Sequence, residues 1–378
     1  MNIEYNIHGW LGLRLVDPSA GSARYLAREL DPLVRAALPA DPDVSLIAVP
    51  HPLAAGTAYR IGNAGDYQEC AFTDVDFCLV NGGRMLCIPF ESVGRCCEVR
   101  YTTGSSLRSV LYYVRPVLHL SLLNKAAIAV HSAAVLYNGG GILFAGWAES
   151  GKTELMLGFL HRGASFISDK WTILEDDGSA IYNFPSPVTV RAWVMKYLPH
   201  LARNLVASER WRLQIGSAAH AVWRTAVESG RIELDGALGR FLAPAFDQAA
   251  RVSVPPSRLF RRINDRGGPQ SLSVSSPLRK VFFLVTRNSP QVSVRPADPA
   301  NVARRLVDCA QYERRGFLGL YTRFKYALPG RRNTLIEEAP ERELAALTRA
   351  LESKEVFLVE MPFPFDPLAA HDAVSRFC

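Results

Sequence analysis

The stretch of sequence that decides the fold is Gly146-Trp147-Ala148-Glu149-Ser150-Gly151-Lys152-Thr153. Its form is Gly-x-x-x-x-Gly-Lys-Ser/Thr, the pattern of a phosphate-binding loop (P-loop). The two glycines let the backbone pass close to phosphate oxygens, and the lysine adds a positive charge beside them. The threonine hydroxyl is a ligand for Mg²⁺ in loops of this kind. The sequence therefore predicts a site for ATP and Mg²⁺, and the alternative is a chance match in a glycine-rich turn.

The segments around the loop have the composition that this motif requires. Residues 127–136 and 142–145 are apolar runs of the strand type, joined by a turn at 138–141, which predicts a hairpin that leads into the loop. A helix is expected to begin near Gly151 and to end near Gly163, so that its N-terminus faces the phosphates. A hairpin at this place is unusual for a doubly wound sheet, in which the P-loop strand is parallel to its neighbours.

Three polar residues outside the eight-residue motif complete the candidate site. His131 lies on the first arm of the hairpin, Glu154 directly follows the motif, and Asp169 ends the strand expected at 164–168. A carboxylate at that strand end lies on the same sheet edge as the P-loop, where acid–base chemistry is needed. The structural alternatives are a hydrogen-bonded core histidine and an aspartate that only caps its strand.

Residues 129–174 resemble the catalytic core of the HPr kinase/phosphorylase family; they read AVHSAAVLYNGGGILFAGWAESGKTELMLGFLHRGASFISDKWTIL. That family shares a P-loop fold of its own with the ATP-dependent phosphoenolpyruvate carboxykinases. It includes kinases that modify ribosomally made peptides, lasso peptides among them. The resemblance implies an α/β fold, with an HPr kinase C-terminal-like P-loop core, a mixed sheet and a smaller N-terminal α+β domain.

The resemblance also implies a role for each matching residue. Asp169 would be the general base that takes the proton from the acceptor hydroxyl, and with Thr153 it would hold Mg²⁺. Lys152 would contact the β- and γ-phosphates, and His131 would lie near the γ-phosphate. Together with Glu154, the loop residues would form the nucleotide-binding segment.

One position departs from the family pattern, in which the strand after the P-loop helix ends in two aspartates. Lys170 stands where the second aspartate is expected. If that aspartate normally holds the ion, then Glu154, Asp176 or water would substitute for it. Alternatively, Thr153, Asp169 and the phosphates hold the ion, and Lys170 contacts the transferred phosphate.

Basic residues outside the loop are further candidates for contacts with anions. Arg191 follows the strand-like residues 187–190 and is a possible phosphate contact, with an ordinary surface arginine as the alternative. Residues 304–332 include eight basic and two acidic residues, and aromatic side chains are interspersed among the basic ones. Such a stretch could bind single-stranded nucleic acid or an acidic peptide, or it could simply form a solvated, half-packed helix and loop. Because no recognised nucleic-acid motif accompanies it, we expect a peptide or protein partner and no nucleic acid.

Two domains are expected from the length of 378 residues. Residues 1–103 are interpreted as an accessory domain that could bind substrate, and residues 104–378 as the kinase domain with the basic stretch at 304–332. Helices are expected at 22–38, 106–125, 191–205, 209–228, 301–310 and 341–351. Expected strands include 44–49, 70–80, 84–89, 171–175, 180–183, 280–285 and 356–361, with hairpin turns at 81–83 and 176–178.

The composition excludes several classes of protein. Hydrophobic residues make up 48% and charged residues 21%, which rules out a mainly disordered chain, a coiled coil and a collagen-like fibre. The seven cysteines include no Cys-x-x-Cys pair, so we expect reduced thiols and neither a disulfide framework nor a zinc site. The N-terminus lacks the pattern of a signal peptide, and polar residues interrupt the most apolar stretch, 126–148. A cytoplasmic protein without a membrane span is expected, and a homo-oligomer is compatible with the sequence.

Together these features predict an ATP-dependent kinase that transfers the γ-phosphate to a hydroxyl. By resemblance to the peptide-tailoring kinases, the acceptor is Ser or Thr of a peptide or protein, and a small hydroxylated metabolite is the main variant. The missing second aspartate motivates a different hypothesis, a nucleotide-binding regulatory module without catalysis.

Overall fold

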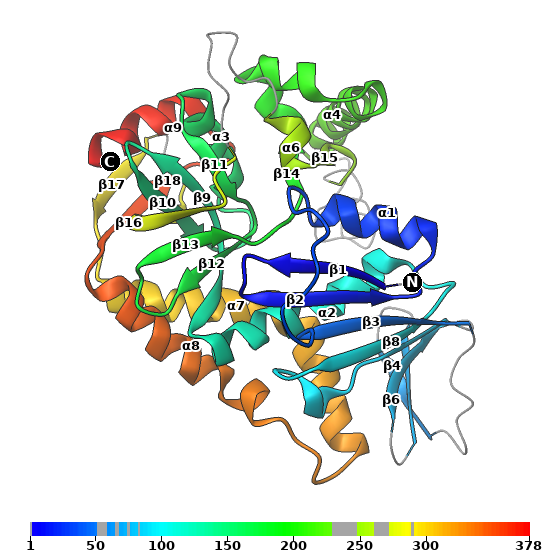
Figure 1. The fold of residues 1–378 in the computed structure, drawn as a ribbon. Coiled ribbons are helices and arrows are strands. Elements are labelled where there is room, and N and C mark those ends of the chain that lie inside the picture. The colour runs from blue at the N-terminus through cyan, green and yellow to red at the C-terminus, as the bar shows by residue number, and fades with distance from the viewer. Residues whose placement is uncertain are drawn as a thin grey trace. The chain divides into compact units, whose positions relative to one another are not determined.

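The computed structural model describes residues 2–50, 59–64, 68–73, 76–81, 84–228, 248–260, 272–288 and 291–378. Over these residues the chain is an α/β protein with large mixed sheets (Figure 1). It divides into two compact units. The first consists of Met1–His131, Ile173–Pro185 and Asp298–Lys354; the second consists of Ser132–Thr172, Ser186–Ala297 and Glu355–Cys378. The expected N-terminal domain lies within the first unit, and its boundary at residue 103 stays a prediction.

The first unit contains an eight-stranded sheet, counted over its described residues. The strands are β1 (Asn2–Ile7), β2 (Leu11–Val16), β3 (Val44–Val49), β4 (Tyr59–Ala64), β5 (Gln68–Phe72), β6 (Phe77–Asn81), β7 (Arg84–Cys87) and β8 (Cys97–Thr102), in the order β1-β2-β3-β8-β7-β6-β5-β4. β3 is parallel to both β2 and β8, and the other neighbours are antiparallel. Every second side chain of β1 and β2 is buried, because alternate residues of a strand face opposite sides of the sheet.

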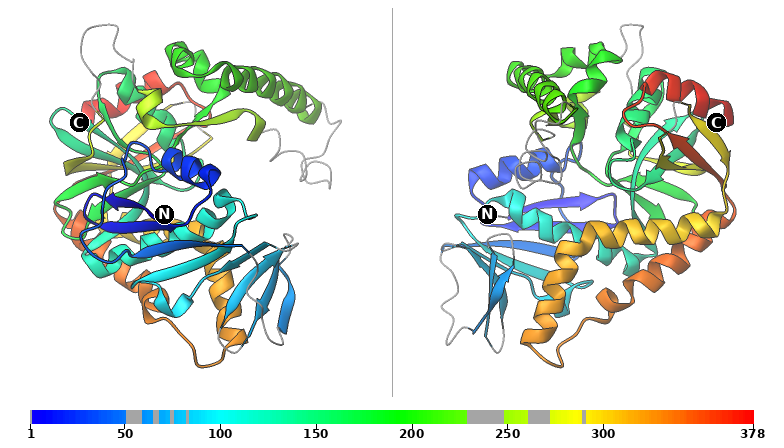
Figure 2. Two further views of the ribbon diagram at one scale, coloured as in Figure 1. Left: turned by 45° about the vertical axis from the view of Figure 1, so that its right-hand side comes forward. Right: turned by 180° about the vertical axis from the view of Figure 1, so that it is seen from behind.

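Four helices accompany this sheet in the described part of the first unit. They are α1 (Ala20–Glu29), α2 (Leu107–Leu122), α7 (Pro299–Ala327) and α8 (Thr334–Glu352). α7 and α8 lie side by side, as both views in Figure 2 show. The Asn333 side chain caps α8 by accepting from the Ile336 amide, and its Nδ2 donates to the carbonyls of Phe90 and Val93. This buried amide therefore fixes the start of α8 to the chain that precedes β8.

An ion pair between α7 and α8 is buried in the first unit. Arg314 Nη2 lies 2.5 Å from Glu343 Oε1, and each side chain is only 1% exposed. Each charge loses its hydration, so it depends on its partner for compensation. The sequence analysis treated Arg314 as part of a basic stretch, and the structure instead places it in the core.

The buried ion pair predicts a large loss of stability when only one charge is removed. Glu343→Leu should lower the free energy of unfolding by about 3–5 kcal/mol, because the Arg314 guanidinium stays buried without its carboxylate. The double variant Arg314→Met with Glu343→Leu should recover most of that loss. Glu338→Gln is the control on the same helix. Its pair with Arg342 is half exposed, so it should cost less than about 1 kcal/mol in urea unfolding. Equal losses in Glu343→Leu and in the double variant would contradict this account.

His119 is a second buried polar residue of the first unit. It is 2% exposed, on α2, and its ring packs edge-on against Phe184 at 4.9 Å between centroids. Burial holds the pKa of His119 well below its ordinary value of 6.5, and the positive charges of Arg314, Arg115 and His131 lower it further. The imidazole is therefore neutral in the folded chain.

This histidine predicts a dependence of stability on pH. Below pH 6.5 the unfolded chain binds a proton at His119 that the folded chain excludes, so this contribution is lost as the pH falls. Between pH 7.5 and 5.5, the wild type should lose more unfolding free energy than His119→Gln, by up to about 1.4 kcal/mol. Urea unfolding of both proteins at the two pH values measures this difference. Parallel losses in the two proteins would show that His119 does not titrate on unfolding.

The second unit is built on the strands around the P-loop. They are β10 (Gly140–Gly146), β11 (Ser165–Ser168), β16 (Ser275–Thr286), β17 (Ser293–Pro296) and β18 (Glu355–Met361), with β9 (Ala127–Tyr137) entering from the first unit. β9 and β10 form an antiparallel hairpin in which Ser132 pairs with Ala145, which confirms the expected hairpin. β10 is parallel to β16, and β16 to β18, so this sheet is mixed.

Helices α3 (Lys152–His161) and α9 (Pro367–Val374) lie side by side against this sheet (Figure 1). Gly158 makes the close approach possible, because a Cβ there would overlap the carbonyl oxygen of Pro367. The remaining elements of the second unit are η3 (Ala192–Lys196), η4 (Pro199–Asn204), α4 (Ala207–Glu228), α6 (Pro256–Leu259), β14 (Val188–Arg191) and β15 (Arg251–Val254).

Several expected elements need correction. The helix expected at 22–38 ends at Glu29, because the residue before Pro32 is disfavoured in a helix. The strand expected at 70–80 is two strands, β5 and β6. Residues 191–205 form the end of β14 and two 3₁₀ segments, and the helix expected at 301–310 is the much longer α7. Strands β12 (Trp171–Glu175) and β13 (Ala180–Asn183) are confirmed, as is the turn between them.

The expectation that all thiols are reduced is wrong for two of the cysteines. Cys78 and Cys87 face each other on the antiparallel strands β6 and β7 and form a disulfide, with 4.2 Å between their Cα atoms. The sequence separation of 9 does not reveal this pairing, because it depends on the register of the hairpin. Gly82 and Gly83, the rest of the turn expected at 81–83, lie outside the described residues. Among the helices of the described chain, none has the length and apolar character needed to span a membrane.

Candidate functional site

The P-loop joins the end of β10 to the start of α3, within the second unit. All seven residues of β10 are buried, and the backbone turns out of the sheet at Gly146 with φ of 146°. A Cβ at Gly146 would lie 2.6 Å from the Leu284 carbonyl oxygen, and one at Gly151 would overlap the Phe365 ring. Gly151 also has φ of 89°, in the left-handed region. Both glycines of the motif are therefore required by packing as well as by backbone conformation.

The Lys152 side chain folds back over the loop. Its Nζ donates to the Gly146 carbonyl at 3.0 Å and to the Trp147 carbonyl at 2.5 Å, and the residue is 7% exposed. The ammonium group is thus held by two carbonyls of its own loop. Trp147 itself is 45% exposed, and the buried Ser150 Oγ has no hydrogen-bond partner among the described residues.

Thr153 and Asp169, both expected at the site, are in direct contact. The Thr153 hydroxyl donates to Asp169 Oδ1 at 2.7 Å, which joins the first turn of α3 to the end of β11. Asp169 is 1% exposed, and its Oδ2 has no hydrogen-bond partner in the described part of the chain. Burial raises the pKa of Asp169, against the effect of the Thr153 hydrogen bond and of the charges of Lys170 and Lys152.

Hydroxyl groups that the sequence analysis did not single out hold the backbone around Asp169. Ser186 Oγ donates to the Asp169 carbonyl at 2.8 Å, and Thr172 Oγ1 lies within hydrogen-bond distance of both Ser132 and Ser168. The Ser132 amide donates to the Lys170 carbonyl at 3.1 Å, and Lys170 has φ of 68°. Serines and threonines scattered along a sequence give no signal of this network, because the sheet register brings them together.

Arg191 lies beside the acidic residues of the loop segment. Its Nη2 is 3.2 Å from Glu149 Oε1, and its Nε is 3.3 Å from Oε1 of the buried Glu154. Burial raises the pKa of Glu154, and the charge of Arg191 opposes that shift. Arg251, which the sequence analysis missed, is 3.9 Å from the same Glu149 oxygen. The phosphate contacts expected of Arg191 and Lys170 stay predictions.

His131 is the last residue of the first unit and is described within it. Its Nδ1 lies 3.9 Å from Glu313 Oε1. The next residue, Ser132, pairs with Ala145 at the entry to the loop. The expected role of His131 near the γ-phosphate stays a prediction.

The residues of the site fit an Mg²⁺ ion of the kind that the motif implies. The described residues hold no group of three or more His, Cys, Asp or Glu side chains arranged for a metal ion. Mg²⁺ in phosphate sites needs fewer, since one or two protein oxygens suffice when phosphates and water supply the rest. Thr153 Oγ1 and the half-satisfied Asp169 carboxylate are oxygen ligands of that type.

The basic stretch at 304–332 forms internal ion pairs in the first unit. Arg314 is buried with Glu343, Arg331 pairs with Glu91, and Lys325 with Glu337. The charges of these three residues are therefore engaged within the first unit, and the acidic peptide partner expected for the stretch stays a prediction.

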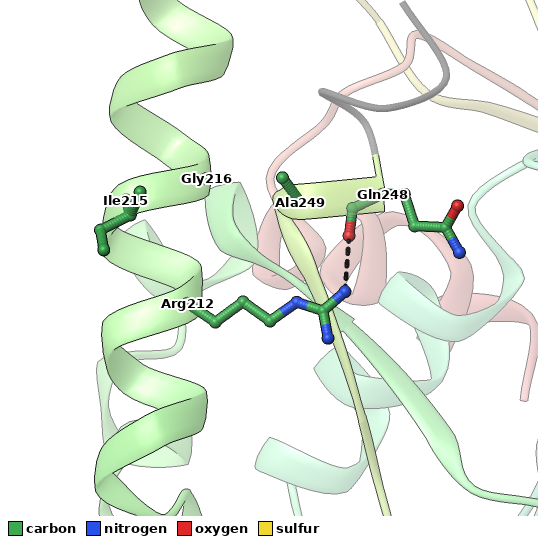
Figure 3. A pocket seen from close by; sticks show the side chains of 5 residues that line it. All are labelled: Arg212, Ile215, Gly216, Gln248 and Ala249. Atoms are coloured by element: carbon green, nitrogen blue, oxygen red, sulfur yellow. Dashed lines mark hydrogen bonds between the residues drawn. The ribbon is translucent and has the colours of Figure 1, made fainter.

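A pocket of about 450 Å³ lies elsewhere in the second unit, between α4 and the residues before β15 (Figure 3). Arg212 Nη2 donates to the Gln248 carbonyl across it at 3.3 Å. Its lining residues are Arg212, Ile215, Gly216, Gln248 and Ala249. None of them belongs to the P-loop segment, so this pocket is separate from the candidate site.

No protein-family model matches the chain, and no significant match was found among curated proteins.

The two kinds of constraint on the loop glycines can be separated by experiment. Gly139→Ala is the control, since Gly139 also has positive φ but a Cβ there would meet nothing within 4 Å. It should cost about 1–2 kcal/mol of unfolding free energy, from backbone strain alone. Gly151→Ala should cost about 1–3 kcal/mol more, because its Cβ overlaps Phe365. Equal costs in thermal or urea unfolding would contradict the packing argument.

Proposed function

We propose that the protein is an ATP-dependent kinase that transfers the γ-phosphate to a hydroxyl, with an HPr kinase-like P-loop core. The observation that carries the proposal is the contact between Thr153 of the P-loop helix and Asp169. A nucleotide-binding loop alone fits many activities. A buried carboxylate that touches the loop, with its second oxygen still available, adds the group that a phosphoryl transfer to a hydroxyl requires.

Lys152 and the loop amides bind the phosphates in this proposal. The Lys152 ammonium is already positioned by the carbonyls of Gly146 and Trp147, so the charge stands at the loop before the nucleotide arrives. The N-terminal end of α3 adds its amide donors and its dipole. Catalysis of this type consists of positioning and charge stabilisation rather than covalent chemistry.

Asp169 receives the proton of the acceptor hydroxyl in this proposal. Burial raises the pKa of this carboxyl, which favours proton uptake, and Oδ2 is the oxygen that the Thr153 hydrogen bond leaves available. Mg²⁺, held by Thr153 and Asp169, would neutralise charge on the phosphate oxygens when bound. His131 would assist near the γ-phosphate, and Lys170 and Arg191 would stabilise the transferred phosphate.

We further propose that the acceptor is Ser or Thr of a peptide or protein, by the resemblance to peptide-tailoring kinases. We also propose that the protein acts in the cytoplasm, where the Cys78–Cys87 disulfide would be an exception to the reduced state usual for that compartment. A small hydroxylated metabolite is the variant. A regulatory module that binds nucleotide without transfer is the second candidate. Lys170 in place of the second aspartate favours it, because it removes one expected metal ligand.

The test is transfer of label from γ-labelled ATP with Mg²⁺ to peptide and metabolite fractions. Asp169→Asn should lower the transfer rate at least about 10²-fold, because the general base is lost while the shape is kept. Asp177→Asn is the matched control. It changes an aspartate in an exposed hairpin turn and should keep the rate within about twofold. Lys152→Ala should abolish transfer.

Near-normal transfer by Asp169→Asn would contradict the assigned base. No transfer by the wild type, together with loss of partner binding in Lys152→Ala alone, would instead support the regulatory module.

A further inference from the structure

Two arginines face each other on the small antiparallel sheet formed by β14 and β15. The register pairs Val188 with Val254, Val190 with Val252, and Arg191 with Arg251. The four valines are buried, so they define the face that packs into the core. Because side chains of a strand alternate between faces, both arginines belong to the opposite, polar face.

Like charges directly opposite each other on neighbouring strands repel. In this structure a carboxylate offsets the repulsion, since Glu149 Oε1 lies 3.2 Å from Arg191 Nη2 and 3.9 Å from Arg251 Nη1. The arginine side chains are 14% and 32% exposed, respectively, whereas the Glu149 side chain is 58% exposed. The exposed Glu149 carboxylate therefore contacts the guanidinium groups of Arg191 and Arg251, which are both less exposed than Glu149 itself.

The position of Glu149 makes its carboxylate the one that a ligand could displace from Arg191 and Arg251. It lies within the P-loop with φ of 63°, and its side chain is more exposed than those of Arg191 and Arg251. Arg191 has a second carboxylate partner in Glu154, which is buried and held 3.3 Å from its Nε. The guanidinium of Arg191 thus keeps its orientation when Glu149 moves away.

We propose that the Arg191–Arg251 pair binds a carboxylate of the phosphate acceptor, which replaces the phosphate contact suggested above for Arg191, and that Glu149 occupies this place until the acceptor displaces it. The inference rests on the proposed kinase function. The pair already accommodates one carboxylate, and a guanidinium fork matches the geometry of a carboxylate better than an ammonium group does. The acceptor is then an acidic molecule, such as a peptide with Asp or Glu near its target hydroxyl or an acidic metabolite. Exchange of one carboxylate for another keeps the charge of the group unchanged.

The test measures binding of glutarate, a dicarboxylate, to the full chain by titration calorimetry, with neutral glutaramide as the comparison ligand. Glu149→Gln should bind glutarate at least tenfold more tightly than the wild type, because the competing carboxylate is gone. Arg251→Gln should bind it at least tenfold more weakly, and Arg251→Lys should lie between, since it keeps the charge without the fork. Glutaramide should bind none of the proteins.

Two controls separate this site from general charge effects and from the nucleotide. Glu338→Gln removes a carboxylate of similar exposure, also paired with an arginine, and should leave glutarate binding unchanged. The dissociation constant for ATP should change less than threefold in Arg251→Gln. If Arg251→Gln instead weakens ATP binding tenfold and leaves glutarate binding unchanged, the pair serves the nucleotide phosphates and the proposal is overturned.

Unchanged glutarate affinity in Glu149→Gln would also overturn the proposal. Glu149 lies on an exposed part of the loop, so this variant reports on the site even if Arg251→Gln does not fold. Glutarate binding needs no phosphate transfer. If the protein binds glutarate as expected but transfers no label, the proposed kinase function is refuted and the proposed carboxylate site is supported.

Discussion

The hydrogen bond from Thr153 to Asp169 is the interaction on which the candidate site depends. It connects the first turn of the P-loop helix to the end of the neighbouring strand, and it draws a carboxylate into a place where that residue is 1% exposed. A buried carboxylate is costly unless it is compensated. Here the Thr153 hydroxyl, a backbone hydrogen bond of Lys170 and the charges of Lys170 and Lys152 favour the ionised carboxylate, and Oδ2 has no hydrogen-bond partner among the described residues.

The surrounding sheet is arranged to keep that carboxylate in place. Ser186 fixes the carbonyl of Asp169, and the Ser132 amide fixes the carbonyl of Lys170, whose backbone is in the left-handed region. Such strain in a residue other than glycine persists only where several contacts determine the conformation. The backbone is therefore held by hydrogen bonds at Asp169 and at the residue after it. In the proposed function, a base that must meet a hydroxyl within hydrogen-bond distance benefits from such positioning.

The sequence predicted the parts of the site that depend on local pattern. The hairpin before the loop, the helix after it and the place of Asp169 directly after β11 follow from glycine spacing and short apolar runs. The sequence did not reveal Arg251, the Ser132–Thr172 network or the Cys78–Cys87 disulfide, because each depends on the register between strands. It also counted Arg314 only as one charge of the basic stretch at 304–332. The burial of Arg314 depends on the ion pair with Glu343. That pair joins two different helices, so the sequence of neither helix alone reveals it.

Every charged group of the P-loop segment has an internal partner in the described structure. Lys152 bonds to loop carbonyls, Glu154 pairs with Arg191, and Glu149 lies between Arg191 and Arg251. In the proposed function, nucleotide binding at this loop would be an exchange of partners, in which phosphate oxygens compete with the Gly146 and Trp147 carbonyls for Lys152. An exchange of this kind avoids the cost of leaving a buried charge uncompensated at any stage. It also makes selectivity a matter of competition, because a ligand is bound only where it satisfies these charges better than the loop itself does.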